Sequence, residues 1–170
     1  ISTVRAGNVV GGGDFSKNRL VPDIIKAINN KKKLIIRNPN HVRPWQHVLD
    51  PLIGYLILAE KQYKNQINDF EHYWNFGPNK GNFKKVIDVV KYIKKKEKLN
   101  YILKKTSLLK ETDVLKLNSL KAKKKLKWLC KWDLIETLDK TIEWNNQVKK
   151  GNSAKNVCEK QFLMHIHNNK

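Results

Sequence analysis

The first fourteen residues constrain the fold more than any other part of this sequence. A run with the sequence Ser-Thr-Val-Arg-Ala-Gly-Asn-Val-Val, residues 2–10, ends at three consecutive glycines, residues 11–13, which Asp14 follows. The run predicts a buried strand that leaves a sheet, and the glycines end it because they do not hold a regular element. Apolar residues then recur at helical spacing over residues 20–28, which predicts a helix directly after this loop. A strand, a loop and a helix in this order are typical of α/β domains.

The rest of the chain alternates short strands with helices. Strands are expected at 34–36, 43–48, 73–76, 101–103 and 114–117, and helices from Asp50 onward and at 83–98, 119–126 and 134–144. Asp50 is expected to cap its helix, with Leu52, Tyr55, Leu56 and Ala59 facing the core. The tryptophans at 128, 132 and 144 are interpreted as core residues.

These elements predict the fold class and a division of the chain. We expect an α/β fold, namely the end of a Rossmann-like doubly wound domain followed by a small mixed α/β lobe. Residues 1–14 are assigned to the first part, and residues 15–145 mainly to the second. Residues 146–170 are polar and lack periodicity, so they are expected to form a disordered tail.

Composition narrows the class of protein. The chain has 170 residues, of which 40% are hydrophobic, so it can form a core. It has no run of about 18 apolar residues, and we expect no membrane-spanning helix. Two cysteines, Cys130 and Cys158, are too few for a disulfide framework, which indicates a reducing, cytoplasmic setting. Cys158 with His165 and His167 is a conceivable metal site, but we expect no metal.

The positive charge does not indicate a nucleic-acid site. The formal charge is +20, but three successive blocks of fifty residues carry +6, +5 and +7. A nucleic-acid footprint would be clustered on one face or in one segment. We therefore expect no specific nucleic-acid partner.

The arginines are more informative than the net charge. Only four of the 35 cationic residues are arginine, namely Arg5, Arg19, Arg37 and Arg43. Lysine replaces arginine on a solvated surface but not at a bidentate anion contact. We interpret the four arginines as sites where the planar guanidinium is needed, and chance clustering is the alternative. Arg19 precedes a predicted helix N-terminus, a region that favours phosphate. Ordinary surface salt bridges are the other interpretation.

Other candidate motifs are weaker. Asn8 lies at the end of the first strand, where open α/β sheets bind ligands, although it can equally stabilise a turn. The glycines match neither a dinucleotide-binding loop nor a P-loop. Two stretches have the spacing Tyr-x-x-x-Lys, Tyr92–Lys96 and Tyr101–Lys105, but such matches are expected by chance among so many lysines. We assign no catalytic residue.

Several stretches together resemble a known family. They are residues 4–14, 19–25, 34–39, 42–49 and 74–78, with Glu111, 115–118, 121–122 and 126–128 farther on. They closely resemble the CDP-glucose 4,6-dehydratases, which are extended short-chain dehydrogenases/reductases of the NAD-dependent epimerase/dehydratase family. The family has glycine and proline where this chain has Lys127 and Cys130. These two differences lie at a turn, so they affect its local geometry rather than the activity that the resemblance implies.

The resemblance implies an activity and a set of site residues. It implies NAD-dependent conversion of CDP-glucose into CDP-4-keto-6-deoxyglucose and water, for the deoxysugars of lipopolysaccharide O-antigen. It implies that Asn8 contacts the sugar nucleotide, Val9 packs near the nicotinamide, Arg19 and Arg43 hold the nucleotide or its diphosphate, Arg37 lies by the base or ribose, and Asn75 lines the same pocket.

The resemblance also implies partners. The family's NAD loop and catalytic Tyr-x-x-x-Lys are not found here, so the chain is expected to match the C-terminal half of such an enzyme. An N-terminal half is then expected to bind most of the NAD, the chain alone to be inactive, and the intact enzyme to be a homo-oligomer. The alternatives are a dehydratase or epimerase for another nucleotide sugar, a CDP-sugar-binding module without chemistry, and a basic nucleic-acid binder.

Overall fold

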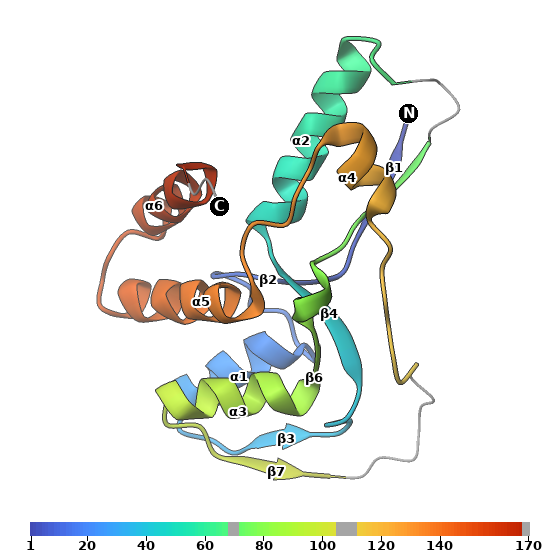
Figure 1. The fold of residues 1–170 in the computed structure, drawn as a ribbon. Helices are drawn as coiled ribbons and strands as arrows, with labels where there is room; N and C mark the ends of the chain where they lie inside the picture. The colour runs from blue at the N-terminus through green and yellow to red at the C-terminus, as the bar shows by residue number, and fades with distance from the viewer. Residues whose placement is uncertain (68–71, 105–111, 168–170) are drawn as a thin grey trace.

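The computed structural model describes residues 1–67, 72–104 and 112–167 (Figure 1). Its strands are β1 (Thr3–Ala6), β2 (Asn8–Val10), β3 (Leu34–Ile36), β4 (Val42–His47), β5 (Tyr73–Phe76), β6 (Phe83–Lys85) and β7 (Tyr101–Leu103). Its helices are α1 (Leu20–Asn29), α2 (Leu49–Tyr63), the short 3₁₀ helix η1 (Lys80–Asn82), α3 (Val86–Lys96), α4 (Leu120–Leu126), α5 (Leu134–Lys149) and α6 (Ala154–His167). The mixed α/β class expected from the sequence is confirmed. Every helix in these ranges is too short or too polar to span a bilayer.

The strands form three small sheets. β1 pairs with β5 and β3 pairs with β7, both in parallel. β4 is the central strand of the third sheet, with β2 parallel on one side and β6 antiparallel on the other. The first residue of β4, Val42, also forms a parallel bridge to Val114. β4 therefore contacts more of the chain than the other strands and connects the two ends of the fold (Figure 1).

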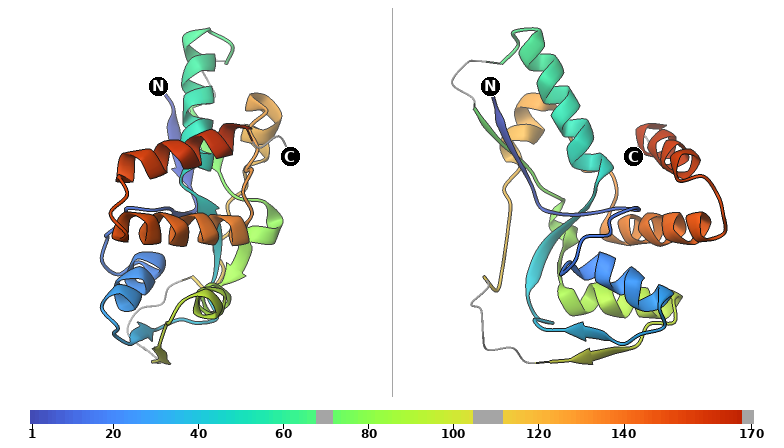
Figure 2. Two further views of the ribbon diagram at one scale, coloured as in Figure 1. Left: turned by 90° about the vertical axis from the view of Figure 1, so that its left-hand side faces the viewer. Right: turned by 180° about the vertical axis from the view of Figure 1, so that it is seen from behind.

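Two hydrophobic clusters hold these elements together. The larger joins α1, α3 and α5 over β3 through residues such as Ile24, Val89 and Leu138. The smaller joins α2, α4 and β5 around Trp74, Phe76 and Trp128. Figure 2 shows the second group of elements at the opposite end of the fold from α1 and α3. The three tryptophans expected in the core are buried, with Trp132 0% exposed.

The first predicted strand differs from expectation. It is divided into β1 and β2 at Gly7, and β1 is largely exposed rather than buried. A Cβ at Gly7 would lie 2.7 Å from the Pro44 carbonyl oxygen, so β4 packs against the backbone at this break. The first strand thus serves two sheets.

The helix after β4 also differs. It begins at Leu49, and Asp50 does not act as its cap. Its buried residues are Asp50, Pro51, Gly54 and Leu58, while Leu52 and Leu56 are exposed. A Cβ at Gly54 would lie 2.4 Å from the Phe76 ring, so the closest packing of α2 is at a glycine, which a hydrophobic pattern does not identify.

The prediction of a disordered tail was wrong. Residues 154–167 form α6, which packs along α5 (Figure 2). Gln161 and His165, four residues apart, are its buried residues. Because the inward face of α6 is polar, the apolar periodicity that predicts a helix is missing.

Candidate functional site

A cavity of about 630 Å³ lies between β2, α1, β3 and β4. Its lining includes five of the six residues expected to bind ligand, namely Asn8, Val9, Arg19, Arg37 and Arg43. They come from four segments that are separated in the sequence. The fold therefore brings together residues that sequence analysis selected one at a time, and their roles toward a ligand remain predictions.

Local structure explains how each segment reaches the cavity. Asn8 and Val9 begin β2, where they pair with Trp45 and Gln46 of β4. Arg19 is the last extended residue before α1. Arg37 directly follows β3. Loops at the ends of strands and helices carry polar side chains without disturbing the core.

The cavity is cationic on balance. The carboxyl groups of Asp14 and Asp23 line it together with the three arginines. The pKa of Asp14 is lowered, mainly by a hydrogen bond from the Ser16 hydroxyl and further by the nearby charge of Arg19. Arg19 and Arg37 are exposed, and neither guanidinium has a hydrogen bond or ion pair within the described part of the chain. These groups suit an anionic ligand better than a cation.

Arg43 is held more tightly than the other two. Its Nη1 donates to the carbonyl oxygens of Val42 at 3.0 Å and Thr112 at 2.9 Å, and its Nη2 lies 2.9 Å from Nδ1 of His41. His41 also lines the cavity, and its Nε2 lies 3.2 Å from a carboxylate oxygen of Asp113. Sequence analysis missed both. The spacing of His41 from Arg43, two residues on an extended segment, was the available signal; nothing in the sequence links Asp113 to either.

Asn75 does not line this cavity. It lies on β5 and pairs with Arg5 of β1 in the register of that sheet. Asn75 is therefore not among the residues that this cavity brings together, and its role toward a ligand stays a prediction.

The Tyr-x-x-x-Lys spacing on α3 has a structural explanation. The Tyr92 hydroxyl and the Lys96 amine both bond to Oδ1 of Asp139, at 2.7 and 2.6 Å. This contact ties α3 to α5, and neither residue lines the cavity. The second pair includes Lys105, which lies outside the described residues.

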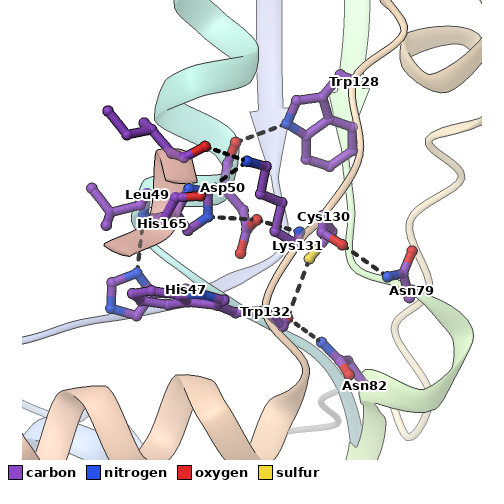
Figure 3. Close-up of polar contacts among 11 residues, drawn as sticks. His47, Leu49, Asp50, Asn79, Asn82, Trp128, Cys130, Lys131, Trp132 and His165 are labelled. Carbon is purple, nitrogen blue, oxygen red and sulfur yellow. Dashed lines mark hydrogen bonds and ion pairs between the residues drawn. The ribbon is translucent and has the colours of Figure 1, made fainter. Parts of the chain in front are cut away.

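A second group of polar residues is buried where α6 meets the start of α2 (Figure 3). Asp50, 0% exposed, accepts a bond from the Lys131 backbone N–H at 2.7 Å and lies 3.0 Å from Nε2 of His165, 1% exposed. Nζ of Lys131 bonds to the carbonyl oxygen of His165 at the end of α6. Trp132 makes one edge-to-face contact with His47 and another with His165. We call Asp50, His165, Lys131, Trp132 and His47 the α6 junction.

The contacts of the α6 junction join α6 to the start of α2 and to the segment around Lys131. No group of three or more His, Cys, Asp or Glu side chains in the described ranges is arranged to hold a metal ion. His165 is bound to Asp50, and Cys158 receives a hydrogen bond from the indole of Trp144 at 3.2 Å. Burial raises the pKa of the neighbouring Cys130 thiol, so it is a poor nucleophile.

Comparison with known proteins identifies relatives of the chain. No family model matches it. It is 38% identical over 165 residues to the CDP-glucose 4,6-dehydratase of Salmonella typhimurium, a match that covers 96% of this chain and 45% of that protein. The chain thus spans less than half the length of this relative.

Solved structures agree on the fold. The UDP-glucose 4-epimerase of Thermotoga maritima, solved with UDP-glucose, superposes with a TM-score of 0.73 at 23% identity, over 87% of this chain and 46% of that one. The dTDP-glucose 4,6-dehydratase of Bacillus anthracis, solved with NAD, gives 0.68 at 22% identity, over 86% and 44%. The resemblance noted in the motifs is confirmed: this chain is a relative of CDP-glucose 4,6-dehydratase and has the fold of the C-terminal portion of the extended short-chain dehydrogenases/reductases.

Proposed function

We propose that the cavity binds CDP-glucose and that the chain is the sugar-nucleotide-binding part of a CDP-glucose 4,6-dehydratase. One observation carries this proposal: Arg19, Arg37 and Arg43 reach a single cavity from three separate segments, in a chain related to that enzyme. The cavity volume, about 630 Å³, is in the range of small-molecule sites.

The chemistry of the lining supports a role for each residue. A guanidinium binds phosphate through two parallel hydrogen bonds, so we assign Arg19 and Arg43 to the diphosphate. Arg19 also stands at the N-terminus of α1, where backbone N–H groups add to the attraction. Arg37, beyond β3, is assigned to the base or ribose, and Asn8 to the sugar nucleotide.

The residues in the cavity fit only a small part of NAD. Val9 offers the nicotinamide an apolar contact beside Asn8, while the sequence has no glycine-rich dinucleotide loop. When bound, NAD would accept the hydride from C4 of the sugar and return it at C6 after water is lost. We propose that residues 1–14 adjoin the NAD-binding part, that 15–145 mainly hold the sugar nucleotide, and that another part of the enzyme supplies the acid and base groups.

Under this proposal the chain alone binds substrate and does not convert it. Among the residues that the structure describes, the lining contains no tyrosine or lysine that could act as acid or base. Its role in the cell would be deoxysugar synthesis, of which O-antigen is one use, in a homo-oligomeric enzyme of the cytoplasm.

Calorimetric titration of the 170-residue chain tests the proposal. CDP-glucose and CDP should bind, UDP-glucose should bind at least about tenfold more weakly, and short DNA should bind only at low salt. Tighter binding of UDP-glucose would favour another nucleotide sugar. Binding of DNA but not of CDP-glucose would overturn the proposal, and turnover of CDP-glucose with NAD by the purified chain would contradict the assignment of the chemistry to another part.

A further inference from the structure

Arg43 lies in a chain of contacts that ends outside the cavity. His41 directly precedes β4, and Arg43 is the second residue of that strand. Nη2 of Arg43 lies 2.9 Å from Nδ1 of His41, and Nε2 of the same ring lies 3.2 Å from Oδ1 of Asp113. One imidazole therefore connects the guanidinium with a carboxylate.

Hydrogen-bond chemistry determines the protonation of this ring. A guanidinium has only donors, so Nδ1 of His41 must accept and carries no proton. The ring proton then lies on Nε2, where it can be donated to the Asp113 carboxylate. The carboxylate selects the tautomer that Arg43 requires.

The backbone holds Asp113 in place beside β4. The Val42 N–H donates to the Asp113 carbonyl oxygen at 2.8 Å, and the Leu115 N–H donates to the Val42 carbonyl oxygen at 3.1 Å. The backbone at Asp113 is thus held by the bridge between Val42 and Val114.

The contact between His41 and Asp113 orients the Arg43 guanidinium and adds little to the stability of the fold. The Asp113 side chain is 88% exposed, and an ion pair so open to solvent adds little to folding stability. The His41 side chain, 14% exposed, is well packed. A neutral ring also orients the guanidinium without placing a negative charge against it, whereas a carboxylate at that position would weaken its attraction for phosphate.

We propose that His41 and Asp113 are positioning residues: Asp113 sets the tautomer of His41, and Nδ1 of His41 holds the Arg43 guanidinium toward the diphosphate of a bound nucleotide. This inference rests on the proposed function. It adds two residues, one of them remote in the sequence, that act on the affinity of the site through the position of Arg43.

Two isosteric substitutions separate the two hydrogen bonds of the ring. The amide oxygen of His41→Asn lies where Nδ1 lies and can accept from Arg43. The amide nitrogen of His41→Gln lies where Nε2 lies and can donate to Asp113, but it offers Nη2 of Arg43 no acceptor in place of Nδ1. We expect the affinity of the 170-residue chain for CDP to stay within about threefold in His41→Asn and to fall about tenfold in His41→Gln and His41→Ala.

The controls keep the result interpretable. His167→Ala removes an exposed histidine on α6 and should leave CDP affinity unchanged. Thermal unfolding of each variant shows whether it is folded. Equal affinity in all His41 variants, or an Asn variant as weak as the Ala variant, would overturn the positioning role.

A spectroscopic measurement tests the ring without a nucleotide. Nitrogen NMR of the ligand-free chain should show the His41 proton on Nε2, and Asp113→Leu should allow the other tautomer to appear. A proton on Nδ1 in the parent chain would overturn the inference whatever the ligand. If the parent chain does not bind CDP, the proposed function fails and the role toward a diphosphate fails with it. If it binds but the His41 variants do not differ, only the positioning role fails.

Discussion

The cavity and the α6 junction use polar residues in opposite ways. In the cavity, Arg19 and Arg37 are exposed and make no hydrogen bond or ion pair within the residues described, so they are available to a ligand. In the junction, Asp50 and His165 are almost completely buried and bond to each other. An exposed charge costs little to keep, while a buried one is tolerated only with a partner. The comparison indicates that loss of a cavity residue should weaken binding, and loss of a junction residue should weaken folding.

The sharpest test of the junction is Asp50→Ala. The substitution leaves the Lys131 N–H and the His165 ring without their buried acceptor, so we expect a loss of about 3–5 kcal/mol in the free energy of unfolding. Asp133→Ala is the matched control, because that exposed carboxylate only caps α5 and should cost about 1 kcal/mol. Urea denaturation measures both. Equal losses would show that the junction is not a special feature of the fold.

Acid should act on the junction through His47. Burial, with the charges of His165 and Lys140, lowers the pKa of His47 from 6.5 to about 3. The unfolded chain binds a proton below about pH 6.5 while the folded chain stays neutral there, so stability decreases as the pH falls from 6.5 toward 3. The slope is up to about 1.4 kcal/mol per pH unit, or roughly 2–3 kcal/mol between pH 6.5 and 4.5.

His47→Asn removes this titration. Urea denaturation at pH 7.0, 5.5 and 4.5 should show a smaller decrease in stability for the variant than for the parent chain. Parallel profiles would show that His47 is protonated as readily in the folded chain as in the unfolded one.

In the cavity, Arg43→Lys should weaken CDP binding with little change in folding. Lysine keeps the charge but loses the bidentate geometry and the contacts with His41 and Thr112. We expect a loss of about 1.5–3 kcal/mol in binding, or roughly 10- to 100-fold. Lys95→Arg on the exposed face of α3 should change nothing. Unchanged CDP affinity in Arg43→Lys would mean that the scarcity of arginine does not mark function.

A substitution at Lys127, just before Trp128, is expected to have a small stabilising effect, in contrast to the losses predicted above. Lys127 ends α4 with φ of 56°, in the left-handed region that favours glycine. Lys127→Gly should therefore stabilise the chain by up to about 1 kcal/mol. Lys124→Gly, inside α4, should destabilise it by a similar amount. Thermal unfolding of the two variants gives the comparison, and a shift in the same direction for both would contradict it.

The difference between the two regions explains what the sequence could predict. Three arginines of the cavity were selected because arginine is rare in this chain, but Arg5, selected on the same ground, does not line the cavity. The apolar pattern of the sequence predicted helices and strands where apolar residues face the core, as Val89, Val90 and Ile93 do on α3.

The junction could not be found in this way. Its inward residues on α6 are Gln161 and His165, and the closest packing of α2 is at Gly54, so no apolar stripe marks either contact. The turn before Trp128 was indicated in advance, because the resemblance placed a glycine where Lys127 adopts its left-handed conformation.

β4 carries a residue of the cavity near one end and a residue of the junction at the other. Arg43 and His47 are four positions apart on β4. Asp50 follows three positions later, in the first turn of α2. Because side chains alternate across a strand, deletion of a single residue between Arg43 and His47 would turn one of them to the opposite face of the sheet. A change in the length of a surface loop has no such effect, whereas the stretch from Arg43 to Asp50 keeps both sites in place only at its present length.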